Sequence, residues 1–249
     1  MPAKYDIPAA YSRGNGMERS SVRADEVARF SALAASWWDP AGPMAPLHAM
    51  NPLRTGWIDR RIRAEFGGPQ RLLDLGCGAG LASEAMARLG HTVVGIDAAA
   101  PAIDAARAHA AGLGLALTYK VGSIERVADI FTAVSCLEVI EHVDDPAVFL
   151  VRTAKVVAPG GLLFVSTLNR TARSLLVAKL GAEYIARMLP VGTHDWRRFV
   201  TPAELGRYGR AAGFATAGAI GMTYDVINRR WKSSADLSIN YLAALRRTS

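Results

Sequence analysis

The sequence predicts an α/β fold in which helices cover both faces of one mostly parallel sheet. Between residues 72 and 168, short apolar segments alternate with segments of helical periodicity, as strands and crossover helices do. A glycine-rich loop at 76–80 separates the first of these strands from the helix after it. The chain has 249 residues, 51% hydrophobic and 20% charged, which suits one globular domain of this class.

The elements outside the sheet begin with residues 1–20, which are rich in Pro, Gly, Ser and charge and are expected to form a flexible lead. The domain is therefore assigned to 21–249. Two N-terminal helices are predicted, one from residue 21 to the stop at Pro40 and one over 52–66. Later helices are predicted at 82–89, 102–111, 147–157 and 203–212.

The predicted core strands are 72–75, 92–96, 117–121, 131–137 and 162–168. Because crossover helices join them, these five strands should pair in parallel. Edge strands at 219–224 and 226–232 would bring the sheet to seven strands. Residues 169–198 interrupt the alternation and are predicted to be a helical insertion.

Charge and cysteine content narrow the possible partners and compartments. The net charge of +7 and the pI near 9.7 suit an anionic partner, such as an acidic membrane surface or a charged cofactor. No basic stripe with interleaved aromatic residues is visible, so a nucleic-acid-binding module is not expected. The only cysteines, Cys77 and Cys136, fit a reducing cytoplasm. The sequence shows no signal peptide and no apolar run of spanning length, so any membrane contact should be peripheral, on the inner face of the cytoplasmic membrane.

The glycine loop indicates a small polar ligand. Gly76 and Gly78 lie between an apolar strand and a helix, where the backbone can approach a ligand closely. In open α/β sheets ligands bind beyond the carboxyl ends of the strands. Asp97 ends the next strand, where it could accept hydrogen bonds from ribose hydroxyls.

Two cofactor classes share this Rossmann-like geometry. A nicotinamide dinucleotide uses G-x-G-x-x-G with its pyrophosphate at the helix N-terminus, whereas the spacing here is G-x-G-x-G. Asp74, just before the loop, would repel a pyrophosphate but could serve the ammonium group of S-adenosylmethionine, directly or through water. The loop therefore predicts S-adenosylmethionine, with a dinucleotide-dependent oxidoreductase less favoured and a simple turn cap by Asp74 as the structural alternative.

A second polar cluster, Glu138, Glu141 and His142, follows the fourth predicted strand. If this segment turns helically, the three side chains share one face and could hold a divalent cation such as Mg²⁺. Methyl transfer from a sulfonium is an in-line displacement, and a phenol with a pKa near ~10 gains from a general base or a cation. His142 and Glu141 are the predicted catalytic residues, and solvated carboxylates with a hydrogen-bonded histidine are the structural alternative.

The insertion at 169–198 contains an amphipathic pattern. Apolar residues recur every four positions, and basic residues flank them: Leu176, Leu180, Tyr184 and Met188, with Arg170, Arg173, Lys179 and Arg187. Two interpretations stay open. The segment is a lid packed on its own domain, or it lies in the interface of an anionic bilayer, and one helix could do both.

Several segments also match a longer pattern that extends from about residue 30 to 241. They are ASWWD at 35–39, PLH at 46–48, NPLR at 51–54, the loop at 74–80, EVIEHV at 138–143, STLNR at 166–170 and GTHD at 192–195. With these segments the chain resembles the ubiquinone-biosynthesis O-methyltransferases, which act on 2-polyprenyl-6-hydroxyphenol and 3-demethylubiquinol. The glycine loop is common to methyltransferases, whereas NPLR and GTHD are particular to this family.

The resemblance implies a class I S-adenosylmethionine-dependent methyltransferase fold and a polyprenylated phenol or catechol as substrate. It implies donor-binding roles for Arg54, Gly76, Asp97 and Leu137, with the Arg54 guanidinium on the donor's carboxylate. Glu138, Glu141 and His142 correspond to magnesium-associated positions of eukaryotic relatives, and association with other enzymes of the pathway is implied. Relatives often have Asp where this chain has Thr132, and some have Met at Leu137, a change that could alter packing on the adenine. A methyltransferase for another small molecule is the closest alternative.

Overall fold

The structure is a computed structural model and describes residues 21, 23–174, 196–225, 228 and 230–248. Its helices are α1 (Ala24–Leu33), η2 (Ala34–Ser36), α2 (Ala45–Phe66), α3 (Leu81–Arg88), α4 (Ala100–Ala110), η3 (Ile124–Arg126), α5 (Pro146–Ala154), η4 (Trp196–Arg198) and α7 (Pro202–Ala211). Its strands are β1 (Arg71–Leu75), β2 (Thr92–Asp97), β3 (Leu117–Val121), β4 (Phe131–Leu137), β5 (Val157–Leu168), β6 (Phe214–Asp225), β7 (Arg230–Ser234) and β8 (Asn240–Arg247).

The eight strands form one sheet in the order β3-β2-β1-β4-β5-β8-β6-β7. The pairs from β3 to β5 are parallel, and β8 pairs antiparallel with both β5 and β6. The strand order reverses between β1 and β4, so their carboxyl ends lie side by side at the topological switch point where open α/β sheets bind ligands.

The predicted fold class and the five parallel strands are confirmed, but the count of seven strands is wrong. The additional strand is β8, which lies between β5 and β6, so the predicted edge strands β6 and β7 join the sheet through it. β5 also begins at Val157 rather than at residue 162, because residues 157–161 are part of the strand and a register shift in β4 accommodates them.

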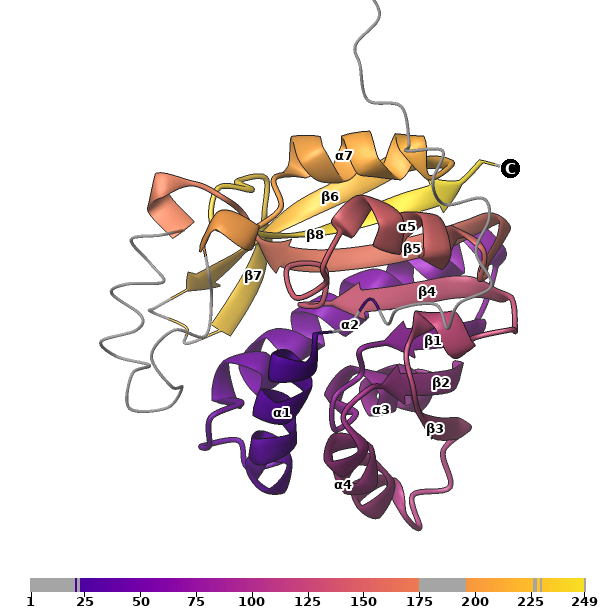
Figure 1. Cartoon of the computed structure of the whole chain (residues 1–249), viewed down its shortest axis with the longest axis vertical. Helices are drawn as coiled ribbons and strands as arrows, with labels where there is room; N and C mark the ends of the chain where they lie inside the picture. The colour runs from indigo at the N-terminus through magenta and orange to yellow at the C-terminus, as the bar shows by residue number, and fades with distance from the viewer. Residues whose placement is uncertain (1–20, 22, 175–195, 226–227, 229, 249) are drawn as a thin grey trace, which may run out of the picture.

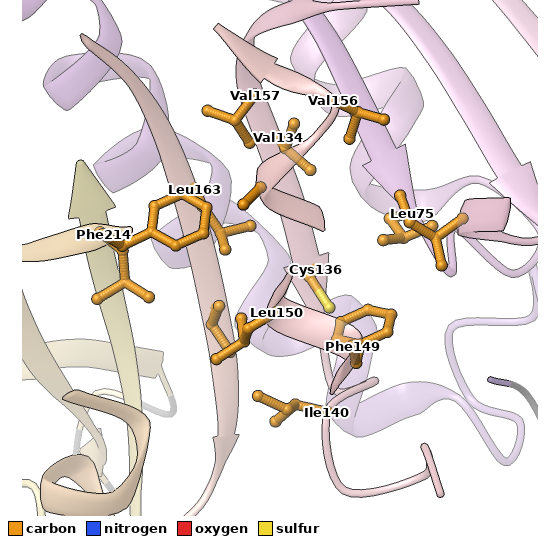
Figure 2. Packing of buried hydrophobic residues seen from close by; sticks show 14 of the residues in the cluster. Leu75, Val134, Cys136, Ile140, Phe149, Leu150, Val156, Val157, Leu163 and Phe214 are labelled. Carbon is orange, nitrogen blue, oxygen red and sulfur yellow. The ribbon is translucent and has the colours of Figure 1, made fainter. Parts of the chain in front are cut away.

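Helices cover both faces of the sheet, and each face has its own core (Figure 1). One face packs against α5 and α7, where Phe149, Leu150 and Leu205 are buried among side chains of β4, β5 and β8. Figure 2 shows Cys136 and Leu163 of this sheet face beside Phe149 and Leu150. The other face packs against α2 and α3.

Local sequence determines where several helices begin and end. The Asp145 carboxylate caps α5 by accepting two backbone N–H groups of the first turn at 2.8 and 3.1 Å. Thr201 and Glu204 form a reciprocal capping box at the start of α7. α2 ends at Gly67, which adopts a φ of 77°.

α2 begins seven residues before the predicted start and contains Pro52 in its interior. A proline there removes one helical hydrogen bond. Tertiary contacts hold this turn, because the buried Asn51 amide donates to the carbonyl of Leu81 at 2.8 Å. None of the helices in the described ranges combines the length and the apolar character needed to cross a membrane.

Candidate active site at the sheet switch point

The glycine loop follows β1 at the switch point and bends over the end of β2. The N–H groups of Gly76 and Cys77 both donate to the carbonyl of Ile96, at 2.8 and 3.1 Å. Gly78 has a φ of 54°, and a Cβ at this position would lie 2.3 Å from Cζ2 of Trp37. Glycine is therefore required at residue 78 both by the backbone conformation and by the close aromatic contact.

Asp97 connects the end of β2 to this loop, as the sequence predicted. Its Oδ2 accepts the N–H of Gly78 at 2.9 Å, and its Oδ1 accepts the N–H of Ala99 at 2.8 Å. Burial raises the pKa of the Asp97 carboxyl, and these backbone donors oppose that rise. The side chain remains partly exposed at the loop, in the position expected of a ribose-binding carboxylate.

Asp74 lies deeper than its predicted role suggests. It is 2% exposed, and its two carboxylate oxygens accept the hydroxyls of Ser83 at 2.6 Å and Ser135 at 2.7 Å. These bonds join β1 to α3 and β4. Asp74 therefore fixes the strand ends around the loop, and any contact with a ligand's ammonium group would be in addition to this structural role.

Arg54 reaches the same region from α2 and is buried, with 3% of its surface exposed. Its Nη1 lies 3.7 Å from Oε1 of Glu138, and its buried Nε has no hydrogen-bond partner. Burial lowers the pKa of the guanidinium, whereas Glu138 and Asp74 raise it. A buried cation with an unused donor is suited to a ligand's carboxylate.

An aromatic cover formed by Trp37 and Trp38 lies over the loop. The indole N–H of Trp38 donates to the carbonyl of Ala79 at 2.9 Å, and its ring stacks on His109 with centroids 3.4 Å apart. His109 in turn contacts the buried Glu84 of α3 at 2.8 Å. The sequence predicted no role for these two tryptophans, which are adjacent in the ASWWD segment at 35–39.

Leu137 ends β4 beside this site. Its side chain is partly buried and packs against the core between the sheet and α2. This position is compatible with the predicted contact to an adenine ring.

The segment after β4 is a turn rather than the helical face that the metal-site prediction required. Glu138 adopts a φ of 56°, and its Oε1 accepts the Ser166 hydroxyl at 2.7 Å. His142 instead pairs with Glu26 of α1, with Nδ1 and Oε2 3.2 Å apart. Within the described ranges no three His, Cys, Asp or Glu side chains are grouped to hold a metal ion, so the arrangement does not fit the predicted Mg²⁺ site.

Glu141 differs from its neighbours because it is directed into the protein. It is 3% exposed, and neither carboxyl oxygen forms a hydrogen bond of normal geometry, although the Thr167 side chain and the backbone of Glu141 are near enough to lower its pKa. Burial, and next the nearby charge of Glu138, raise the pKa of Glu141 well above its ordinary value. Glu141 also lines a pocket of about 250 Å³ between the β4–α5 turn and α7.

The described ends of the insertion are attached to the domain. Arg170 forms an ion pair with Glu204 of α7 and donates to the carbonyl of Arg197 at 3.2 Å. Arg173 pairs with Asp236 at 2.9 Å. The predicted amphipathic stripe, together with His194 and Asp195, falls in 175–195, outside the described residues.

Comparison with known proteins identifies the fold and the family. A family model described as a methyltransferase domain matches residues 48–217. Among solved structures, the magnesium protoporphyrin IX methyltransferase of Synechocystis with bound SAM has a TM-score of 0.62 at 15% identity, over 94% of this chain and 100% of that one. A possible histamine N-methyltransferase of Thermotoga maritima has a TM-score of 0.61 at 14% identity, over 89% and 99% of the two chains. These structures show the same fold.

Sequence relatives are much more similar. The ubiquinone biosynthesis O-methyltransferase of Thiobacillus denitrificans is 47% identical, over 92% of this chain and 99% of its own length. The protein of that name from Azorhizobium caulinodans is 45% identical, over 89% of this chain and 92% of its own length. The one from Pseudomonas aeruginosa is 43% identical, over 92% of this chain and 99% of its own length. The resemblance found in the sequence is therefore confirmed, and the chain belongs to the ubiquinone biosynthesis O-methyltransferase family.

Proposed function

We propose that this protein transfers the methyl group of S-adenosylmethionine to a phenolic hydroxyl of polyprenylated ubiquinone precursors, 2-polyprenyl-6-hydroxyphenol and 3-demethylubiquinol. The observation that carries the proposal is the buried Arg54, which has an unpartnered Nε and whose guanidinium lies 3.7 Å from Glu138, the residue after β4. A methionyl carboxylate is a ligand group that would satisfy it. Family membership supports the choice of acceptor.

The donor would be held by groups from three strand ends and α2. Arg54 would bind its carboxylate, Asp97 would accept its ribose hydroxyls, and Leu137 would contact its adenine. Gly76 and Gly78 would allow the backbone to approach it closely. Asp74 would support this arrangement through its two serine contacts.

The donor supplies an electrophilic methyl group on a sulfonium. In the proposed reaction, His142 accepts the phenolic proton, the phenolate oxygen forms a bond to the methyl carbon, and the bond from that carbon to sulfur breaks, leaving S-adenosylhomocysteine. Glu26, 3.2 Å from His142, would orient the imidazole and stabilise its protonated form. No step is assigned to Mg²⁺, because the described side chains do not fit a metal site.

The first test is calorimetric titration of the purified protein with S-adenosylhomocysteine and, separately, with NADH. We expect binding of S-adenosylhomocysteine alone. A methyl-transfer assay on catechols with prenyl tails of different lengths, with and without EDTA, then tests the reaction. We expect turnover to rise with tail length and to persist in EDTA. Failure of S-adenosylhomocysteine to bind would overturn the proposal. Turnover that does not depend on tail length would favour another small-molecule acceptor.

Peripheral membrane contact through 169–198 and association with other pathway enzymes stay predictions. The ion pairs of Arg170 and Arg173 within the domain are contacts expected of a lid. Vesicle sedimentation with anionic lipid tests the membrane contact, which should weaken when Arg170, Arg173 and Lys179 are changed to Ala.

A further inference from the structure

The pocket between the β4–α5 turn and α7 has the size and lining of a site for a single small ring. Its volume is about 250 Å³, below the ~300–1,000 Å³ of pockets that enclose drug-sized ligands. Ile140, Val143, Phe199 and Val200 line it and are all buried, so part of its wall is apolar. These apolar side chains would contact one side of an aromatic ring.

One polar group in this wall lacks a hydrogen bond of normal geometry. Glu141 is 3% exposed and neither carboxyl oxygen forms such a bond, although the Thr167 side chain and the backbone of Glu141 are near enough to lower its pKa. A buried polar atom left in this state destabilises the protein, so such groups normally have a protein, water or ligand partner. Because Glu141 lines the pocket, an occupant can supply the missing donor.

The charges around the pocket favour a neutral occupant. Arg170, Arg197 and Arg198 line it together with Asp144 and Glu204. The arginines would oppose an ammonium group, and Glu141 in its ionised form would oppose an anion. A neutral ring bearing hydroxyl groups avoids both penalties and still offers a donor to Glu141.

The pocket also adjoins the expected donor site. Glu141 lies within electrostatic range of Glu138, which raises its pKa, and Glu138 lies 3.7 Å from Arg54. A ring in the pocket would therefore lie next to the end of β4, where the proposed donor site begins.

We infer that this pocket binds the hydroxylated ring of the methyl acceptor, with a ring hydroxyl donating a hydrogen bond directly to Glu141. The inference rests on the proposed function and assigns Glu141 as a residue that recognises the acceptor by direct contact rather than through a metal. The contact requires no change in the charge of Glu141, because a carboxyl oxygen accepts a hydrogen bond in either protonation state.

Binding of two matched probes tests this contact without requiring turnover. One probe is a catechol carrying one prenyl unit, and the other is the same ring with fluorine in place of both hydroxyls. Affinities are measured by calorimetry on the full chain saturated with S-adenosylhomocysteine, with and without EDTA. We expect the wild-type protein to prefer the catechol by about five- to tenfold, as one net hydrogen bond would give.

Two variants of similar volume separate hydrogen bonding from packing. Glu141→Met removes the acceptor and should reduce the preference to about one, whereas Glu141→Gln keeps a carbonyl acceptor and should retain most of it. Glu65→Gln is the control, because this carboxylate, in the last turn of α2, forms a partly exposed ion pair with Arg246 and does not line the pocket, so the preference should be unchanged. Thermal unfolding confirms that each variant is folded.

An unchanged preference in Glu141→Met, no preference in the wild-type protein, or a preference abolished by EDTA would each overturn the inference. Methyl transfer to the catechol probe is measured separately. If the wild-type protein discriminates between the probes through Glu141 but transfers no methyl group, the pocket assignment stands and the proposed function fails. If it methylates the probe while Glu141→Met keeps the preference, only the pocket assignment fails.

Discussion

Replacement of Arg54 by Met should weaken binding of S-adenosylhomocysteine while leaving binding of 5′-methylthioadenosine nearly unchanged. The second ligand has the same adenosine group but no amino-acid end. The Arg54 side chain is buried and its Nε is unpartnered, so the bound carboxylate would form one or two charge-assisted hydrogen bonds with it. Such bonds contribute about 1.5–3 kcal/mol, which corresponds to a roughly 10- to 150-fold weaker Kd for S-adenosylhomocysteine.

The fold should survive this substitution. After loss of Arg54, Glu138 keeps the Ser166 hydroxyl at 2.7 Å, and its side chain is 22% exposed, so it is not left as a fully buried, isolated charge. Arg60→Met, an exposed position on the same helix, is the matched control and should bind both ligands as the wild-type protein does.

Calorimetric titration of the wild-type protein and both variants with both ligands gives four ratios of dissociation constants. An equal loss of affinity for the two ligands would show that Arg54 shapes the whole pocket rather than binding the carboxylate. Unchanged affinity for both would place the carboxylate elsewhere. Either result would refute the assignment of Arg54.

Three further predictions concern the glycine loop and the stability of the fold. Gly78→Ala should abolish donor binding and destabilise the fold by at least about 1–2 kcal/mol, because a Cβ would lie 2.3 Å from Trp37 at a left-handed φ of 54°. Thermal unfolding and calorimetric titration measure the two effects. Wild-type affinity for the donor would contradict the prediction. Burial lowers the pKa of His91, whose Nδ1 accepts the N–H of Gln70, so the unfolded chain takes up the proton first. The stability contributed by neutral His91 should be complete above pH 6.5 and decrease as the pH falls below it. Between pH 7.5 and 5.5 the free energy of unfolding, measured with denaturant, should therefore change less in His91→Gln than in the wild-type protein. An equal change in both proteins would show that His91 is not the cause. Thr201→Ala should lower the free energy of unfolding by about 1 kcal/mol through loss of the α7 capping box, and an unchanged denaturation midpoint would show that the cap contributes nothing.

The parallel half of the sheet was predictable because its strands are short apolar segments bounded by glycine, proline and polar residues. β8 was missed for a physical reason. Its run from Tyr241 to Leu245 is uninterruptedly apolar and contains two alanines, so it lacks the alternation of a half-buried strand and has good helix formers. It becomes a strand because both of its edges are paired in the sheet.

The candidate site, like the sheet, could be predicted only in part. The loop glycines and Asp97 could be located because they directly follow strands, and the topology fixes where strands end. The directions of Glu138, Glu141 and His142 could not be predicted. The positive φ of Glu138 turns the chain out of β4 and prevents the helical spacing that would have placed the three side chains on one face.

The position of β8 has a consequence for the order of events during synthesis. Among the described residues β8 is the last strand, yet it lies between β5 and β6 and supplies the hydrogen bonds that join them. Roughly 80 residues are made after β5 ends, which takes roughly 4–16 s at typical translation rates. Until β8 has been made, this edge of β5 lacks its native partner strand, and its backbone N–H and C=O groups are available for edge-to-edge pairing with another chain.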